Sequence, residues 1–330
     1  MYLGVDAGNS KTVALVCDAT GTVRGAARTG IGDIYGAPSA AVAVDAVVTA
    51  VRTALADAGV GPAAVSGAAF RLAGVDWPED HRYWHDVLGN RLPDLPAASV
   101  LNDGFAPLRC GVLDGVGVAV VVGTGPAVAA RGPGGREHSL GWWLQGPLGA
   151  TGLGDSALRA VYDADLGLGP PTALTAALLA VYGDRDVEAL LHAFTRRQEP
   201  RGWLDRGRAA RAVLAAAAAG DGVAAAIVGA QAELFADHAR VAATRVAFPA
   251  DATVPVVLAG SVLGAPDSLL STSLVVALSE RLPGARITRS DLPPVAGAVL
   301  DAMAEAGAPP TPATVATLRA SAPPEDFLRT

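Results

Sequence analysis

The feature that most constrains the fold is a glycine- and hydroxyl-rich turn between two short apolar strands, which occurs twice in the chain. The first unit has expected strands over residues 2–5, 12–17 and 22–27, and the second over residues 117–123 and 127–131. In both units the turn joins antiparallel strands, whereas the phosphate loop of a P-loop or Rossmann unit leads from a strand into a helix. The repeat therefore predicts two β-meander domains of one kind.

The rest of the pattern adds helices and further strands to both units. Strands are expected at residues 63–72, 98–102, 254–258 and 287–289, helices at 39–58, 80–88, 274–281 and 294–306, and mostly helical, alanine-rich chain at about 155–245. At 330 residues with 51% hydrophobic content, the chain is long enough for about two domains with real cores. We expect an α/β protein with an N-terminal domain over 1–112, completed by a helix at 292–308. A C-terminal domain over 113–291 would carry the helical insertion.

Charge and cysteine content narrow the class of protein. The net charge is −7, with no basic stripe for nucleic acid and no polybasic or long apolar segment for a membrane. The start has no leader-like pattern, so we expect a cytoplasmic protein with neither nucleic acid nor a membrane as partner. Cys17 and Cys110 lie far apart without a CxxC pattern, which argues against a disulfide framework or a metal cluster built within the chain.

The single lysine of the chain, Lys11, lies in the first glycine-rich turn, while every other strongly basic side chain is an arginine. A compact ammonium suits a phosphate held by backbone N–H groups better than the wide guanidinium fork does. The alternative is chance, because a lone lysine must lie somewhere. The turn around it favours a role in phosphate binding.

These turns and three further segments carry a resemblance to a known family. The chain resembles the N-acetylglucosamine kinase and BadF/BadG/BcrA/BcrD ATPase family, which has the actin/hexokinase/Hsp70-type ATPase fold, over nearly its whole length. The resemblance implies two ribonuclease H-like domains with an interdomain cleft, and ATP and Mg²⁺ as cofactors. Residues 4–12 are similar to the family's first phosphate loop, residues 121–125 to its second, and residues 258–262 to its adenosine motif.

The resemblance implies nucleotide-binding roles for individual residues. Gly8 would allow close backbone approach to a phosphate, and Asp6 would orient Mg²⁺ through water. A turn-capping carboxylate is the alternative for Asp6, and an ordinary strand-to-helix turn is the alternative for the adenosine motif. The other residues implied in nucleotide binding are Asn9, Ser10, Lys11, Thr12, Gly123, Thr124, Gly125, Gly260 and Ser261.

Two segments at the ends of expected strands resemble the parts of the family that bind the acceptor. Asp103 matches the position of the family's catalytic aspartate at a strand end. The role suits the chemistry, since phosphoryl transfer to an alcohol needs a carboxylate that accepts the hydroxyl proton. An Asx turn at the strand end is the structural alternative. Asn102 would hold this turn or contact substrate. Another segment would line the acceptor cleft with Gly74, Asp76 and Trp77, although it also suits a helix start with acids in the first turn.

Two segments depart from the family's pattern at the acceptor pocket. N-acetylglucosamine kinases of the family carry an Asn-His pair in the loop that here spans residues 30–36, and two acids in the segment that here spans residues 141–149. This chain has Asp33 without a histidine in the first segment and neither acid in the second. We therefore expect an acceptor other than N-acetylglucosamine, such as an aminosugar, an aminocyclitol or a sugar-bearing nucleoside. The expected acceptor contacts are Asp33, Tyr35, Asp76, Trp77, Trp142, Trp143 and Gln145, with core packing as the alternative for the tryptophans.

Several functions fit these observations. The leading hypothesis is an ATP-dependent kinase that phosphorylates a hydroxyl of a small sugar-like molecule, with Asp103 as general base. One alternative is an activating ATPase of the BadF/BcrA type, which needs cysteines at a dimer interface for an iron–sulfur cluster. Another is a non-catalytic sugar- or nucleotide-binding protein. We also expect a homodimer, because the helical segment is alanine-rich and similar kinases often dimerise.

Overall fold

Each half of the chain builds a five-stranded sheet, and the two sheets share one strand order. The computed structural model describes residues 1–249 and 251–328. The first sheet has the order β3-β2-β1-β4-β5 and the second the order β8-β7-β6-β9-β10. In each sheet an antiparallel meander is followed by two strands that pair in parallel. The repeated topology confirms the predicted α/β class with two matching β-meander units. The strands are β1 (Tyr2–Ala7), β2 (Thr12–Cys17), β3 (Val23–Thr29), β4 (Gly67–Leu72), β5 (Ala98–Asn102), β6 (Gly117–Val122), β7 (Pro126–Arg131), β8 (Glu137–Ser139), β9 (Val254–Ala259) and β10 (Ala285–Arg289).

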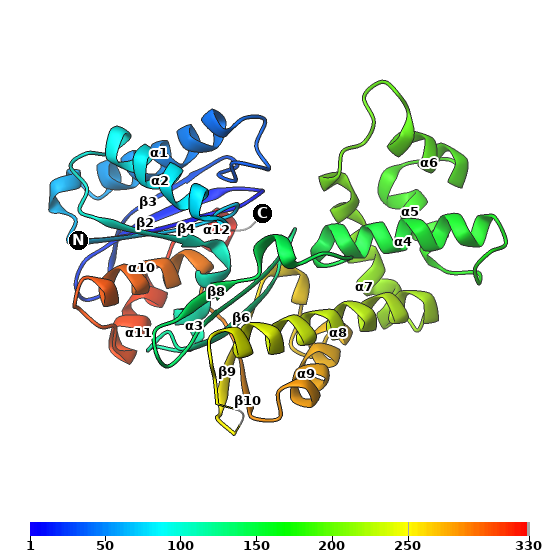
Figure 1. Ribbon diagram of the computed structural model, residues 1–330. Coiled ribbons are helices and arrows are strands. Elements are labelled where there is room, and N and C mark those ends of the chain that lie inside the picture. The colour runs from blue at the N-terminus through cyan, green and yellow to red at the C-terminus, as the bar shows by residue number, and fades with distance from the viewer. Residues whose placement is uncertain (250, 329–330) are drawn as a thin grey trace.

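Helices cover both faces of the first sheet (Figure 1). Helices α1 (Ala40–Asp57) and α2 (Pro78–Arg91) pack on one face, and α10 (Pro294–Glu305) and α11 (Pro312–Ser321) pack on the other. Successive side chains of a strand point to opposite faces. All six residues of β2 are buried, and all but Thr12 are apolar, so this strand is covered on both sides. The first half of the chain therefore has a core on each side of its sheet.

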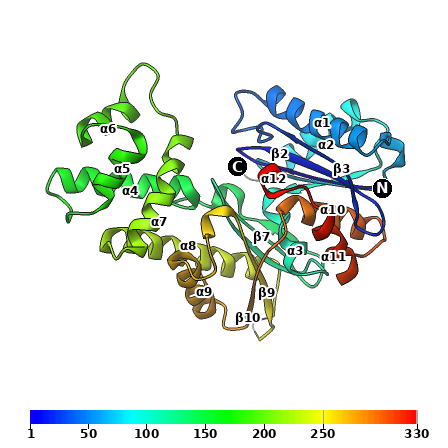
Figure 2. The same cartoon turned by 180° about the vertical axis from the view of Figure 1, so that it is seen from behind.

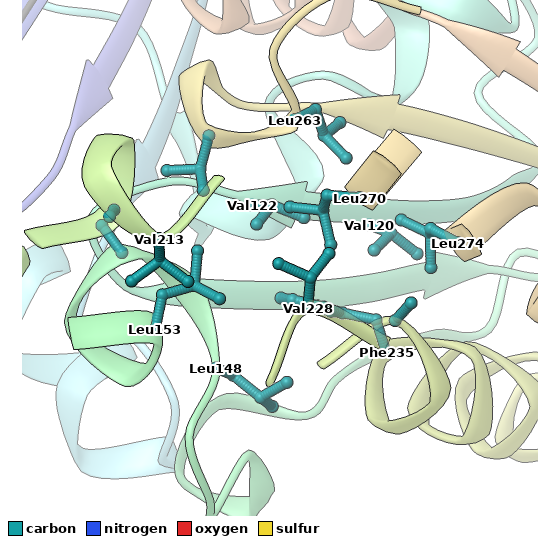
Figure 3. Packing of buried hydrophobic residues seen from close by; sticks show 14 of the residues in the cluster. Val120, Val122, Leu148, Leu153, Val213, Val228, Phe235, Leu263, Leu270 and Leu274 are labelled. Carbon is teal, nitrogen blue, oxygen red and sulfur yellow. The ribbon is translucent and has the colours of Figure 1, made fainter. Parts of the chain in front are cut away.

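The second sheet is covered by α8 (Gly222–Arg245) and α9 (Leu269–Arg281). Figure 3 shows Val120 and Val122 of β6 beside Val228 of α8 and Leu270 of α9. Helices α4 to α7 form a lobe that extends beyond the sheet (Figure 1). Among the described residues, no single helix is long and apolar enough to cross a membrane. One pair of helical segments joined at a bend would be long and apolar enough when the two are taken together. The remaining helices are α3 (Leu108–Gly111), α4 (Gly149–Asp165), α5 (Leu174–Tyr182), α6 (Val187–Thr195), α7 (Ala210–Ala218) and α12 (Glu325–Leu328).

The structure corrects several predicted boundaries. The strand expected from residue 63 begins at Gly67, because residues 62–64 form a 3₁₀ turn that starts with Pro62 directly after Gly61. Strand β8 was not predicted, since it is three residues long and has no apolar alternation. Helix α11 was also not predicted, although Thr311 caps it and Pro312 stands at its first position. The 3₁₀ turns are η1 (Pro62–Ala64), η2 (Asp103–Phe105), η3 (Gly141–Trp143), η4 (Leu204–Ala209) and η5 (Ser261–Leu263).

A buried ionic cluster joins the two halves. Asp301 of α10 accepts hydrogen bonds from Arg71 of β4 at 2.7 Å, from Arg109 of α3 at 2.5 Å and from Arg131 of β7 at 3.3 Å. Burial alone would raise the pKa of Asp301, but the three guanidinium groups outweigh it and hold that pKa below its ordinary value. Because Arg131 belongs to the second sheet and Asp301 to a helix of the first, this cluster helps to fix how the two sheets meet.

Candidate active site

The two predicted phosphate loops meet between the sheets. In the first sheet β1, β4 and β5 run parallel, so their carboxyl ends lie at one edge. In the second sheet β6 and β9 do the same. The loops that follow β1 and β6 touch, with Ser10 Oγ and Thr124 Oγ1 at 3.2 Å. The carboxyl edges of both sheets therefore face one interdomain site.

The first loop is a tight turn with an open face. The Gly8 N–H donates to the carbonyl of Lys11 at 2.9 Å, and no atom lies near the position that a Gly8 side chain would take. The side chain of Asn9 packs against Gly36. Thr12 departs from the prediction, because it is fully buried and its hydroxyl lies against Gly32, where it has no hydrogen-bond partner among the described residues. The structure thus brings Gly8 and Ser10 to the loop surface but not the Thr12 hydroxyl.

The second loop is held by the start of α4. The N–H groups of Ala150 and Thr151 donate to the carbonyls of Gly123 at 2.9 Å and Thr124 at 3.2 Å. Gly123 also donates to the carbonyl of Gly125 at 3.2 Å. These bonds fix the loop backbone while the Thr124 hydroxyl remains directed at Ser10.

The predicted adenosine motif lies at the end of β9. Gly260 has φ +106°, a conformation that side chains disfavour, and a side chain there would meet the backbone of Val122. Ser261 begins the turn η5 and is exposed. The backbone conformation and the close packing on the predicted second phosphate loop therefore both require glycine at this position. Without a side chain at Gly260, the backbone at the end of β9 stays accessible.

Acidic side chains gather at the edge of the first sheet. Burial, and after it the charges of Asp6, Asp76 and Asp33, raise the pKa of Asp103 well above its ordinary value. Burial also raises the pKa of Asp6 to about 7, against the opposing effect of Lys11. Asp103 thus lies in a buried, acidic environment that favours its protonated form.

Both halves contribute to a cavity of about 400 Å³ beside this edge. The first half supplies Asp76, Trp77 and Asn102, and the second supplies Trp142 and Trp143. Asn102 donates its amide to Asp76 at 2.8 Å and accepts from the Gly104 N–H at 2.9 Å, so it both holds the turn before Asp103 and lines the cavity. Burial first, and then Asp80 and Asp33, raise the pKa of Asp76 to about 6. The cavity wall therefore combines the acidic side chain of Asp76 with tryptophans from both halves.

The two tryptophans of η3 are not core residues. Trp142 is 48% exposed and Trp143 is 66% exposed, which contradicts the alternative of core packing. Trp142 meets Tyr35 edge to face at 5.5 Å between ring centroids, so an aromatic contact bridges the two halves beside the cavity. Gln145 is exposed, donates to the carbonyl of Trp142 at 2.7 Å and does not line the cavity.

Asp33 and Tyr35 lie near the cavity without lining it. Asp33 is buried, accepts from the Tyr35 N–H at 2.9 Å and packs against Gly74, whose φ is +76°. The Tyr35 hydroxyl donates to Asp80 at 2.8 Å. Asp80 also accepts from the N–H groups of Asp76 and Trp77, as an acid in the first turn of α2 is expected to do. Asp33, Tyr35 and Gly74 therefore contact one another and neighbours of the cavity but do not line it.

Sequence reasoning missed part of the cavity lining. His81 of α2 and Phe105 of η2 contribute from the first half, and the edge strand β8 contributes Glu137, His138 and Ser139. His81 Nδ1 lies 3.0 Å from the carbonyl of Val100, which fixes the ring. The residues of β8 themselves do not indicate a strand, because a short edge strand of polar residues resembles a loop. The one hint in the sequence is the glycine-rich turn before it.

Comparisons with known proteins agree with this architecture. The model of the BadF/BadG/BcrA/BcrD ATPase family matches residues 3–304. The chain belongs to this family. A comparison with curated protein sequences finds no significant match. The match shows that this BadF/BadG/BcrA/BcrD family member is related to ATPases, and residues 305–330 lie outside the matched range.

Solved structures share the fold at low sequence identity. A candidate N-acetylglucosamine kinase from Chromobacterium violaceum is 23% identical with TM-score 0.67, covering 90% of this chain and 97% of its own. One from Porphyromonas gingivalis is 19% identical with TM-score 0.61, covering 91% and 97%. A ROK family glucokinase from Streptomyces griseus, in complex with glucose and AMPPNP, is 18% identical with TM-score 0.58, covering 90% and 96%. This family member therefore has the predicted actin/hexokinase-type fold.

Proposed function

We propose that the protein is an ATP-dependent kinase that transfers a phosphoryl group to a hydroxyl of a small sugar-like molecule. One observation carries the proposal: the two glycine-rich loops touch through Ser10 and Thr124, at the same sheet edges that present Asp103. Phosphoryl transfer depends mainly on positioning and on neutralising charge, so loops that grip phosphates from two sides beside a carboxylate are the parts it needs.

Nucleotide phosphates would lie between the two loops. Gly8 leaves open space for a phosphate to approach the backbone, and the hydroxyls of Ser10 and Thr124 would donate to phosphate oxygens in place of their mutual bond. Lys11 would supply positive charge. The adenosine would rest against the bare backbone at Gly260 and Ser261.

The acidic edge suits Mg²⁺. Burial raises the pKa of Asp6, and the charge of Asp6 in turn helps to raise the pKa of Asp103. Hard oxygen donors of this kind are what Mg²⁺ prefers. Among the described residues, no three acidic, histidine or cysteine side chains lie close enough to hold a metal by themselves. Asp6 would therefore hold the ion together with water and phosphate oxygens. When bound, Mg²⁺ neutralises charge on the phosphates.

Asp103 would act as the general base. The acceptor hydroxyl gives its proton to the Asp103 carboxylate while its oxygen attacks the γ-phosphorus. The bond from phosphorus to the bridging oxygen breaks, and ADP leaves with that oxygen. Burial and the neighbouring acids raise the pKa of Asp103, and a general base works best when its pKa lies near the working pH.

The acceptor would occupy the acidic and aromatic cavity. Asp76 and Asn102 offer hydrogen bonds to hydroxyl or amino groups, and Trp142 offers an exposed ring for a sugar face. An amino-substituted sugar or cyclitol, or a sugar-bearing nucleoside, suits a cavity with an excess of carboxylates. An assay of ADP release with wild-type protein across these acceptors tests the proposal. Release that rises several-fold with one acceptor supports it, and release that no acceptor changes contradicts it.

The position of the cysteines disfavours the activating-ATPase alternative. Cys17 is fully buried in β2, and the Cys110 thiol lies 3.7 Å from the carbonyl of Pro293. Burial raises the pKa of both thiols to about 12, so neither is set up as a thiolate ligand at a subunit surface. Iron analysis of anaerobically purified protein tests this point, since stoichiometric iron would favour the alternative.

We also propose that the protein is a homodimer. At the end of α4, Leu166 and Leu168 are 70% and 77% exposed, and Trp203 on the same lobe is 58% exposed. Apolar side chains this exposed are common where subunits meet. Sedimentation equilibrium at micromolar concentration tests the proposal, and a monomer there would reject it.

A further inference from the structure

The C-terminal segment returns to the first phosphate loop. Helix α11 is anchored on the first sheet, where Leu318 is fully buried and the Ser321 hydroxyl accepts from the Val23 N–H at 2.9 Å. The chain then leads to α12, which lies beside β2 in Figure 2. This places residues 322–328, which we name the C-terminal strap, next to the turn that carries Lys11.

The strap is held by backbone and side-chain contacts. Lys11 Nζ donates to the carbonyl of Leu328, and Arg28 Nη1 donates to the carbonyls of Asp326 at 3.3 Å and Phe327 at 3.1 Å. Consecutive carbonyl groups of the strap thus face two cations. The side chains of Phe327 and Leu328 pack on the apolar cluster that α10 and α11 form with β2.

The contact with Lys11 engages the cation that the proposed function assigns to nucleotide phosphate. Its ammonium is partly buried, and burial and the nearby Arg28 lower the pKa of Lys11 against the opposing effect of Asp6. Hydrogen bonds to charged groups are stronger than those to neutral ones, so a phosphate can displace the carbonyl of Leu328. The strap also lies outside residues 3–304, the range that matches the family.

We propose that the C-terminal strap is an autoinhibitory segment that competes with nucleotide phosphate for Lys11 and is released when ATP binds. The inference rests on the phosphate role of Lys11 in the proposed function. Release of the strap would regulate this site, because any event that displaces the strap from Lys11 raises the affinity for nucleotide.

Calorimetric titration with a non-hydrolysable ATP analogue and Mg²⁺ tests the strap independently of any acceptor. Two variants release it: a chain that ends at Ser321, and the full-length Phe327→Ala variant, which removes an apolar anchor without changing charge. The matched control is Val315→Ala, which removes apolar volume from the same cluster on α11. Loss of a charge-assisted hydrogen bond corresponds to roughly a 10-fold change in affinity, so both released variants are expected to bind about 5- to 50-fold more tightly than wild type and the control.

A synthetic peptide of residues 312–330 provides a second readout. Added to the shortened chain, it is expected to weaken nucleotide binding in a way that excess nucleotide reverses. Equal or weaker binding by both released variants, with wild-type binding intact, overturns the strap and leaves the kinase proposal standing. Strap-dependent binding without transfer to any acceptor overturns the kinase proposal and leaves the strap standing. Absence of nucleotide binding in every protein overturns both.

Discussion

The hydroxyl oxygens of Ser10 and Thr124 lie 3.2 Å apart, although 114 residues separate them in the chain. Each comes from the turn that follows the central strand of its own sheet. The contact brings the glycine-rich loops of the two sheets together directly. A nucleotide that binds between the loops must therefore replace this bond with bonds from both hydroxyls to phosphate oxygens.

Thr124→Val removes the hydroxyl and keeps the shape of the side chain. A hydrogen bond to a charged phosphate contributes about 1.5–3 kcal/mol, so we expect affinity for ATP with Mg²⁺ to fall by at least roughly 10-fold. Calorimetric titration measures the change. Thr20→Val, in an exposed turn outside the site, is the matched control. Unchanged affinity in Thr124→Val would show that this hydroxyl does not contact nucleotide.

The cluster around Asp301 predicts a large effect on stability. Asp301→Asn leaves three arginines without their shared anion in a buried setting, and breaking such a cluster costs about 3–5 kcal/mol. Denaturant unfolding measures the loss. Asp291→Asn removes an exposed ion pair with Arg319 and should change the free energy of unfolding by less than about 1 kcal/mol. Similar values for the two variants would mean that the buried cluster does not join the halves.

Asp76 predicts a pH-dependent change in stability. Its pKa of about 6 lies above its ordinary value of 3.8, so between these values the folded state keeps a proton that the unfolded chain releases. Wild-type protein therefore loses stability as pH rises through this window. Asp76→Asn keeps an oxygen that can accept from Asn102 but does not titrate. We expect it to raise the free energy of unfolding on the order of 1–2 kcal/mol near neutral pH, with little effect near pH 4.

Denaturant unfolding of wild type and Asp76→Asn at both pH values checks this difference. Asp45→Asn is the control, because Asp45 is exposed and pairs with Arg91 at the surface. A gain in Asp76→Asn that is equal at both pH values would show that the carboxyl group does not hold its proton more tightly in the folded protein.

Much of this architecture could be predicted because its signals are local. The turns after β1 and β6 predicted two similar units. The roles of Asp103 and Gly260 were implied by the family resemblance, and the structure places these residues directly after β5 and β9. The acceptor side could not be predicted in full, because its lining combines Trp142 and the short strand β8 with Asp76 from the other half. Such contacts depend on how the two sheets dock. The pairing of Lys11 with Leu328 is likewise a contact between the two ends of the chain, which no local pattern indicates.

The burial of Thr12 shows a limit of reading roles from a motif. Its hydroxyl stands next to Ser10 and Lys11 in sequence, yet Thr12 begins strand β2. Every position of β2 is buried, so the Thr12 side chain lies in the core, while Ser10 stands in the turn before the strand and reaches Thr124. Where the strand begins, and not position in the motif, decides which of these hydroxyls can reach phosphate.

The role of Asp103 is the central claim, and turnover of Asp103→Asn against wild type tests it most directly. The experiment follows formation of the phosphate ester by phosphorus NMR with the acceptor that gives the greatest ADP release. Melting temperature and affinity for ATP show whether the variant remains folded and able to bind nucleotide. Loss of a general base reduces rate by roughly 10²–10⁴-fold, so we predict ester formation slowed by that factor with nucleotide affinity retained. Ester formation at the wild-type rate in the folded variant would contradict the account.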